Sequence, residues 1–345
     1  MSVSWARRCC QDAEWGVRVA KSEKQKLKLL YLKDILLEKT DEEHYLKMEE
    51  IINLLAEKDI AAERKSIYND MEMLRKYGTD VDSSRRSGYR ILGRDFETAE
   101  VKALIDAVQY SRFISRKKTR ELIEKLKGLV SEYEAKSMRV NKALTEKIKS
   151  DNEMVLIAID KIMEAIENNK QISFRYYSWT PDKEKKYSNE GKQRVVNPWD
   201  LCWDNTAYYC MTSTPENPTE ARIFRVDKMD KVSVTNKDRT PEGVERFRDF
   251  NSLEFSEKHF SMFNGEMKKV TLCCDNNMAN VIIDRFGTDV SMRRLDDDHF
   301  VVHIMVAVSK QFFGWLFGLG SGVKIVEPAE VVQQYKDMAK EILEQ

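Results

Sequence analysis

The 345-residue sequence is poor in the residues that interrupt regular structure, with 13 glycines and six prolines. This scarcity excludes a collagen-like or low-complexity architecture. An excess charge of either sign is also lacking, because 58 Lys and Arg balance 58 Asp and Glu. The balance excludes a histone-like polycation, so any nucleic-acid site must be a local basic patch. No apolar run approaches the length of about 18 residues that a membrane helix needs, so we expect no membrane contact.

Motifs for metal binding, disulfides and catalysis are lacking as well. The six cysteines form no CxxC pair and no histidine has zinc-finger spacing, which predicts free, buried thiols and a cytoplasmic protein. We find no P-loop, GxSxG or HExxH motif, so we expect no catalytic residue and no cofactor. His299 and His303 would lie roughly 13 Å apart on the expected strand, too far to share a metal ion. The acidic run 296–298 is expected at a hairpin tip.

The length and the 42% hydrophobic content predict a multidomain α+β protein with two or three domains. Residues 1–22 have basic residues but no apolar signal-peptide core, and we expect them to be disordered. Residues 23–94 have the pattern of a winged helix-turn-helix. Its first helix is expected to bury one face, made of Leu27, Leu30, Tyr31 and Ile35. A second helix follows, with the apolar face Met48, Ile51, Ile52 and Leu55.

The third helix of this domain is expected to span 63–77 and to end at Gly78. Its buried stripe is Ile67, Met71 and Leu74. The helical period places Lys65, Asn69, Glu72 and Lys76 on the opposite face. A hairpin follows, with strands 80–82 and 89–92 and the basic turn 83–88.

Residues 95–169 are expected to form a helical connector with three amphipathic segments. The first two have the stripes Val101, Leu104, Ile105 and Val108, and Leu122, Leu126, Leu129, Val130 and Tyr133. The third has Val155, Ile159, Ile162, Met163 and Ile166. These stripes exceed what one winged domain can cover, and a symmetric DNA site calls for a two-fold partner, so we predict a homodimer.

At residue 172 the apolar period changes from 3.6 to 2. About five short strands within 170–240 predict a small β-barrel; four of them are expected at 172–176, 194–196, 207–211 and 222–226. Residues 241–266 are predicted to be a linker. Strands and helices alternate again in 267–345, which predicts a ferredoxin-like α+β domain.

Four blocks, in this order, resemble one family of proteins. IAAERKSIYNDMEMLRKYG with GYRIL resembles the recognition helix and wing of DeoR-type regulators, and FETAEVKALIDAVQYSRF resembles the connector that follows. RVVNPWDLCWDNTAYYCMT with RIFRVDKM resembles the WYL domain, an Sm-like barrel. FFGWLFGLGSGVKIVEPAEVVQQY resembles the C-terminal extension of the same proteins. The resemblance to WYL-domain transcriptional regulators covers residues 24–345. Two departures are the triplet Tyr208-Tyr209-Cys210 in place of Trp-Tyr-Leu, and Asn69 where family members often carry Arg.

The third helix carries the candidate residues for DNA. Its N-terminal half could reach base edges in the major groove while cations contact phosphates. Residues 61–94 hold eight Lys or Arg against five Asp or Glu. The candidates are Arg64, Lys65, Ser66, Tyr68 and Asn69 on the helix, and Arg85 and Arg86 on the wing. The alternative is a winged fold used only for protein contacts.

Basic and aromatic side chains alternate along the predicted barrel. Arginines bind phosphate bidentately and tyrosines can stack on bases, which suggests an anionic ligand. The candidates are Tyr176, Arg194, Tyr208, Arg222 and Arg225. Strand parity puts Arg222 and Lys228 on the side of Phe224 and turns Arg225 away, so Arg194, Arg222 and Tyr176 are favoured. Alternatively, these arginines and the nearby Arg175 are solvated or paired with Asp200, Asp204 and Asp227.

Together these observations favour a ligand-responsive regulator that binds double-stranded operator DNA and senses a single-stranded nucleic acid or nucleotide. A second hypothesis is an accessory protein of a nuclease-based defence system that binds single-stranded nucleic acid and modulates an effector. A third, in which the barrel is an active site, has no motif to support it.

Overall fold

The computed structural model describes residues 21–139, 149, 152–204, 207–248 and 265–344. The chain forms two compact units, Met1–Tyr110 with Thr119–Thr145, and Ser111–Lys118 with Glu146–Gln345. The segment expected to be disordered, 1–22, lies outside the described residues except for Lys21 and Ser22, which instead begin the first helix. In the part of the chain that the structure describes, no helix is both long and apolar enough to cross a membrane.

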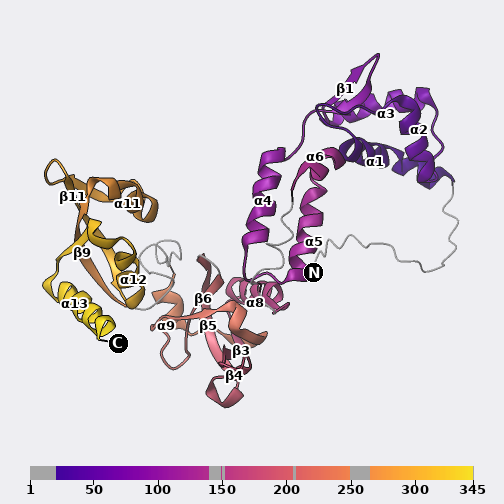
Figure 1. The fold of residues 1–345 in the computed structure, drawn as a ribbon. Helices are drawn as coiled ribbons and strands as arrows, with labels where there is room; N and C mark the ends of the chain where they lie inside the picture. The colour runs from indigo at the N-terminus through magenta and orange to yellow at the C-terminus, as the bar shows by residue number, and fades with distance from the viewer. Residues whose placement is uncertain (1–20, 140–148, 150–151, 205–206, 249–264, 345) are drawn as a thin grey trace. The chain divides into compact units, whose positions relative to one another are not determined.

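The first unit begins with three helices and a two-stranded hairpin (Figure 1). The helices are α1 (Lys21–Lys39), α2 (Met48–Glu57) and α3 (Arg64–Tyr77), and the hairpin pairs β1 (Val81–Ser84) with β2 (Gly88–Ile91). The buried stripe predicted for α3 is confirmed, since Ile67, Met71 and Leu74 are at most 2% exposed. Gly78 ends α3 with a left-handed φ of 102°, a conformation that glycine adopts without steric strain.

The hairpin is attached to the chain before α2 at Gly88. Leu46 exchanges two backbone hydrogen bonds of 2.9 Å with Tyr89. A Cβ atom on Gly88 would lie 2.1 Å from the Leu46 carbonyl oxygen, and the φ of Gly88 is +114°. Only glycine therefore permits this close approach, which sets where the β1–β2 hairpin leaves the helices.

The predicted buried face of α1 is wrong for three of its four residues. Leu27, Leu30 and Tyr31 are 43%, 59% and 37% exposed, and only Ile35 is buried. The face that packs against α2 and α3 carries Leu32, Ile35 and Leu36 instead. Because α1 has apolar residues on both sides, periodicity alone does not decide which side faces the core.

The connector helices form a core of their own. They are α4 (Thr98–Tyr110), α5 (Arg116–Lys127) and α6 (Glu132–Ser137), and their buried residues are Val101, Ile105, Ile123, Val130 and Met138. Contrary to expectation, Leu104, Leu129 and Tyr133 are 37–40% exposed. The second predicted stripe requires one continuous helix, but α5 ends at Lys127 and Ser131 caps a new helix.

The second unit contains a curled antiparallel sheet of six strands in place of the five or so expected. They are β3 (Lys170–Trp179), β4 (Lys185–Tyr187), β5 (Arg194–Asp204), β6 (Ala207–Ser213), β7 (Arg222–Arg225) and β8 (Met229–Asp238). The order is β4-β3-β5-β6-β7. Strand β8 also pairs with β3, on the edge opposite to β5. Arg194–Val196 of β5 pair with β3, and Asn197–Asp204 pair with β6. The β5–β6 pairing contains a register shift between Pro198 and Asp200. This change of partner within one strand bends the sheet.

Helix α8 (Val155–Glu167) packs against β8, β5 and β3, and so belongs with the sheet rather than with the connector. Its buried residues are Val155, Ala158, Ile162 and Ala165, whereas Met163, expected to be buried, is 57% exposed. The predicted linker 241–266 includes a short helix, α9 (Pro241–Arg246), and its residues 249–264 lie outside the described residues.

The C-terminal part of this unit is a four-stranded antiparallel sheet with helices. Its strands are β9 (Glu266–Asp275), β10 (Ser291–Arg294), β11 (His299–Val308) and β12 (Val323–Glu327), in the order β10-β11-β9-β12. Its helices are α11 (Ala279–Phe286), α12 (Lys310–Gly318) and α13 (Ala329–Leu343). The polar strand β10 has no apolar alternation and was not predicted. The acidic run 296–298 lies at the β10–β11 hairpin tip, as expected.

The four cysteines in the described residues are not in disulfide bonds. Cys202, Cys210 and Cys274 are buried, as predicted, and Cys273 is half-buried. Cys210 stands at the leucine position of the triplet and is fully buried in β6. Burial raises the pKa of the Cys210 thiol, which keeps it protonated at neutral pH.

Candidate nucleic-acid interface and anion pocket

The N-terminal half of α3 presents a mixed polar and basic surface. Arg64, Lys65, Tyr68 and Asn69 are all exposed. Arg64 forms an ion pair of 2.7 Å with Glu49, and both side chains are more than half exposed. Such an exposed pair is weak, so a phosphate could displace Glu49 from Arg64.

Ser66 does not share this exposed surface. Its hydroxyl accepts a hydrogen bond from the Lys28 ammonium group, and Lys28 also pairs with Asp70 at 2.7 Å. The lysine is almost fully buried in α1. Ser66 therefore helps to join α3 to α1 and is the weakest of the candidates on α3.

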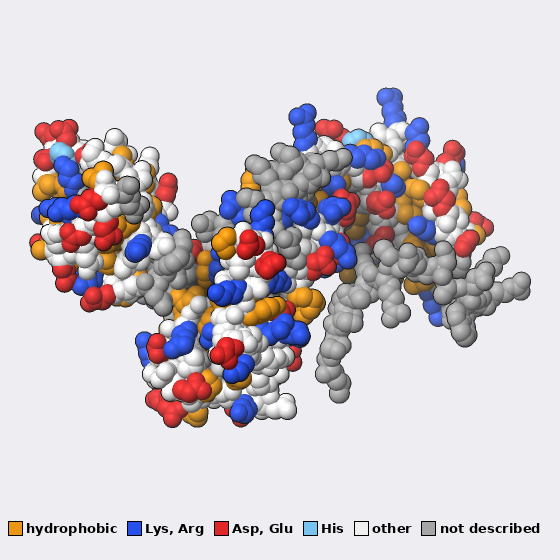
Figure 2. All heavy atoms as spheres, turned by 60° about the horizontal axis from the view of Figure 1, so that its bottom comes forward, with side chains coloured by type: hydrophobic (Ala, Val, Ile, Leu, Met, Phe, Trp, Pro, Cys, Tyr) orange, Lys and Arg blue, Asp and Glu red, His pale blue; other side chains and the backbone are white. Residues whose placement is uncertain are grey.

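Arg85 and Arg86 lie in the turn that joins β1 to β2, and both are exposed. The remaining arginine of the hairpin, Arg90, pairs with Asp82 at 2.8 Å. Figure 2 shows Lys and Arg side chains intermixed with Asp and Glu over the visible face of the protein. A basic site on such a surface depends on local groups such as this wing tip.

Arg194 and Arg222 lie on one pocket of the curled sheet, with a volume of about 430 Å³. Arg194 is the cross-strand neighbour of Phe174, and Arg222 that of Thr212. Phe174 and Thr212 are fully buried, and paired residues share a face of the sheet. Both arginines thus extend from the buried face to a common mouth, lined further by Phe224, Val196, Asn189, Gln193, Thr214, Glu216 and Asn217.

These two guanidinium groups retain donors for a ligand. Arg194 donates one hydrogen bond of 3.1 Å to the Ser188 hydroxyl, and no ion pair of its guanidinium group is found within the described residues. Arg222 lies 3.9 Å from Glu220, and both side chains are well exposed. We call this site, defined by Arg194, Arg222 and Phe224, the two-arginine pocket. Its chemistry suits phosphate.

Tyr176 lies behind the two-arginine pocket. Its ring packs edge-on against Phe224, with centroids 5.0 Å apart. Its hydroxyl oxygen accepts a hydrogen bond of 3.3 Å from the Arg225 backbone N–H. Burial raises the pKa of Tyr176, so the phenol stays neutral and supports the pocket floor.

The remaining candidates of the curled sheet do not line this pocket. Arg225 donates two hydrogen bonds of 2.9 and 3.0 Å to Asp227, as the pairing alternative anticipated. Tyr208 stacks on Trp203 and receives Phe113 edge-on. Arg225 and Tyr208 thus contact these neighbours and do not line the two-arginine pocket.

Two expectations about neighbouring cations also need correction. Arg175 pairs with Asp230, which was not among the anticipated partners. Lys228 lies in the 3₁₀ turn after β7, over the rings of Tyr177 and Trp179. Strand parity does not extend to Lys228, because β7 ends at Arg225.

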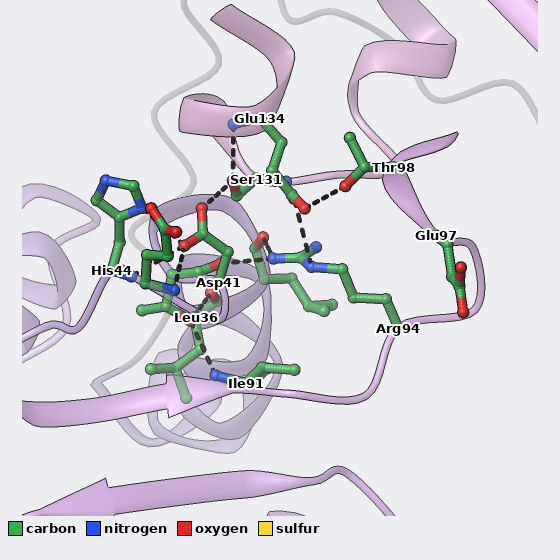
Figure 3. Close-up of polar contacts among 12 residues, drawn as sticks. Leu36, Asp41, His44, Ile91, Arg94, Glu97, Thr98, Ser131 and Glu134 are labelled. Carbon is green, nitrogen blue, oxygen red and sulfur yellow. Dashed lines mark hydrogen bonds and ion pairs between the residues drawn. The ribbon is translucent and has the colours of Figure 1, made fainter. Parts of the chain in front are cut away.

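A polar junction between the α1–α2 loop, the wing and the connector helices was missed by the sequence analysis (Figure 3). Asp41 accepts a hydrogen bond of 2.6 Å from Ser131 and lies 2.7 Å from His44 Nδ1. The His44 ring stacks on Tyr133, with centroids 3.7 Å apart. Ser131 and Glu134 form the capping box of α6, and this S-x-x-E pattern is the sequence signal that could have located one side of the junction.

Arg94 completes the junction from the chain that leaves the wing. It donates to the backbone carbonyl groups of Leu37 and Thr40 and lies 3.8 Å from Glu134. Glu134 also accepts a hydrogen bond from Thr98 at the start of α4. The junction borders a cavity of about 770 Å³. These bonds fix the three-helix core against the connector within the first unit.

We predict that Asp41→Ala lowers the free energy of unfolding by about 1–3 kcal/mol at pH 7, because the substitution leaves the buried Ser131 hydroxyl without its acceptor and removes the bonds from His44 and the Glu43 backbone N–H. Burial alone would raise the pKa of Asp41, but hydrogen bonds from Ser131 and His44 outweigh it and hold the pKa below its usual range. A depressed pKa stabilises the fold above the unfolded value of about 3.9, and this stability is lost as the pH falls through the folded pKa.

Urea titrations of the two proteins between pH 7 and pH 3 measure this effect. The stability difference should narrow below about pH 4, where the unfolded-state carboxyl becomes protonated. The exposed neighbour Glu43 supplies the control variant Glu43→Ala. A loss for Asp41→Ala no larger than that of the control would refute the role of the junction.

Two parts of the second unit match known domain families. Residues 158–234 match the WYL domain, and residues 267–343 match the WCX domain. The chain thus contains a WYL domain that includes Arg194 and Arg222, followed by a WCX domain. No curated protein matches the chain.

The solved structures that are similar to the chain include two that are 16% and 14% identical to it. One is the proteasome accessory factor B/C (PafBC) of Arthrobacter aurescens, 16% identical over 90% of this chain, with a TM-score of 0.26. The chain spans 45% of that protein's length. The other is described as a CRISPR Cas-related protein; it is 14% identical, with 85% of this chain and 76% of that chain covered and a TM-score of 0.37.

Proposed function

We propose that this protein is a ligand-responsive transcription regulator that binds operator DNA as a homodimer in the cytoplasm. The observation that carries the proposal is the exposed set on α3 and the wing: Arg64, Lys65, Tyr68, Asn69, Arg85 and Arg86. A helix N-terminal half with exposed amide and basic groups suits the major groove, and a basic hairpin tip suits the backbone or minor groove.

The sensing part of the proposal is assigned to the WYL domain. The two-arginine pocket offers guanidinium donors beside an aromatic ring, a combination that suits phosphate and a stacked base. We assign a single-stranded nucleic acid or nucleotide as the ligand. Such a ligand alters DNA binding only if it binds the two conformational states with different affinity. No catalytic residue, cofactor or metal forms part of the proposal.

Selection of duplex sequences from fragmented genomic DNA by the full chain tests the DNA-binding role. We expect enrichment of a two-fold sequence whose half-sites lie about 10 base pairs apart, or a multiple of that spacing. Failure to enrich any duplex would refute the regulator. Capture of single-stranded nucleic acid alone would instead support an accessory protein of a defence system.

A further inference from the structure

Helix α1 is apolar on two sides, and among the described residues of the first unit only one of these sides packs into the core. Leu32, Ile35 and Leu36 lie in the core with α2 and α3. On the other side Leu27, Leu30 and Tyr31 are 37–59% exposed, at the i, i+3, i+4 spacing of one helical stripe. We call these three residues the outer face of α1. A stripe of this kind on an exposed helix indicates a contact surface.

The charges that flank the outer face are arranged symmetrically about Leu30. Lys26 lies four residues before Leu30 and Asp34 four residues after it, and both are exposed. The nearby Lys33 points toward α3 and not toward the outer face, because its ammonium group lies 5.0 Å from the centroid of the Tyr77 ring. In an antiparallel pair of α1 helices centred on Leu30, Lys26 of each copy lies toward Asp34 of the other. The face is therefore complementary to itself, as a two-fold interface requires.

The connector is a poorer candidate for the same contact. Its buried residues Val101, Ile105, Ile123, Val130 and Met138 fill a core within one chain. Much of the apolar surface from which a dimer was predicted is thus buried within the connector of a single chain. Leu104, Leu129 and Tyr133 of the connector are 37–40% exposed, but Leu104 lies on α4, Leu129 precedes α6 and Tyr133 lies on α6. The outer face of α1 instead places three exposed apolar residues on one helix.

We propose that the outer face of α1 is the homodimer contact of the winged domains, with two α1 helices packed antiparallel and Lys26 of each facing Asp34 of the other. This proposal rests on the proposed function only in that a two-fold operator requires a two-fold protein. It brings two α3 helices into one symmetric assembly through a helix that also holds Ser66 by way of Lys28.

Sedimentation equilibrium of the full chain, without DNA, tests this contact. We expect a dimer of twice the 40.4 kDa chain mass at micromolar concentration. Leu30→Glu should raise the dimer dissociation constant about 100-fold or more, because it removes two apolar side chains from the centre of the interface. The matched control is Leu104→Glu on the connector, which is 40% exposed and should leave the dimer intact.

Charge reversal tests the antiparallel geometry. Lys26→Glu alone and Asp34→Lys alone should each raise the dimer dissociation constant, since each places two pairs of like charges across the interface. An equimolar mixture of the two variants should form a heterodimer, because the carboxylate introduced in one chain then faces the ammonium group introduced in the other. The second pair of that heterodimer keeps the native Lys26 and Asp34. Circular dichroism melting of each variant checks that these exposed substitutions leave the fold unchanged.

A monomeric wild-type chain, a dimer that survives Leu30→Glu, or a mixture that stays monomeric would overturn the α1 contact. Failure of this proposal is distinguishable from failure of the proposed function. A monomer that still selects a duplex leaves the regulator in place without the α1 contact. A dimer sensitive to Leu30→Glu that selects no duplex leaves the contact and removes the regulator.

Discussion

Replacing Arg85 and Arg86 with alanine is expected to weaken binding to every duplex and to flatten its salt dependence. Both side chains are exposed at the tip of the β1–β2 hairpin. There they can contact phosphates, whereas the base contacts are assigned to α3. The logarithm of the binding constant falls linearly with the logarithm of the salt concentration, and each lost phosphate contact makes this slope shallower by roughly one unit. A dimer that loses two contacts in each half should therefore lose about four units of slope. Fluorescence anisotropy between about 50 and 200 mM salt measures the slope. An unchanged slope would exclude phosphate contacts at the wing.

Substitutions on α3 provide the contrast to the wing variant. Lys65→Ala and Asn69→Ala should reduce specific binding more than non-specific binding, because a lost base contact removes about 1–3 kcal/mol of discrimination. Lys76→Ala is the matched control, since Lys76 is exposed on the same helix in its last turn. Equal losses on specific and random duplexes would show that α3 contacts only the backbone.

Replacing Arg194 and Arg222 with alanine is expected to weaken the binding of short single-stranded oligonucleotides by about 100-fold or more. Hydrogen bonds to charged groups contribute about 1.5–3 kcal/mol each, and the variant removes two guanidinium groups from one pocket. Binding by the wild-type chain should fall with salt, and a mononucleotide should bind more weakly because it has fewer bases to stack, at about 1–3 kcal/mol per base. Titration of fluorescent oligonucleotides with the full chain measures both effects.

Two controls separate the pocket from general electrostatics. Lys186→Ala/Lys237→Ala removes the same charge from exposed positions on β4 and β8 of the same sheet and should have little effect. Arg194→Lys/Arg222→Lys keeps the charge but loses the planar fork, so it should restore only part of the affinity. Equal binding by the alanine variant and the wild type would refute the assignment of these arginines, and no binding by the wild type would refute the sensor.

The sequence determined those features that depend on local periodicity and on residues with restricted backbone angles. The stripe Ile67, Met71 and Leu74 and the stop at Gly78 located α3, because a helical period and a glycine C-cap are properties of one segment. Alternation along 222–225 separated Arg222 from Arg225 in the same way. The alternation does not predict the side of Lys228, because β7 ends at Arg225 and the chain turns after it.

The tertiary structure alone decided which of several suitable partners each residue meets. Helix α1 has apolar residues on two sides, and only packing against α2 and α3 selected Leu32 and Leu36 for the core. Asp41 and Ser131 are 90 residues apart in the chain yet form one hydrogen bond, and Arg194 and Arg222 come together only because the sheet curls through β5. Such contacts follow from the path of the whole chain, and local sequence determines the properties of each segment but not the segment that packs against it.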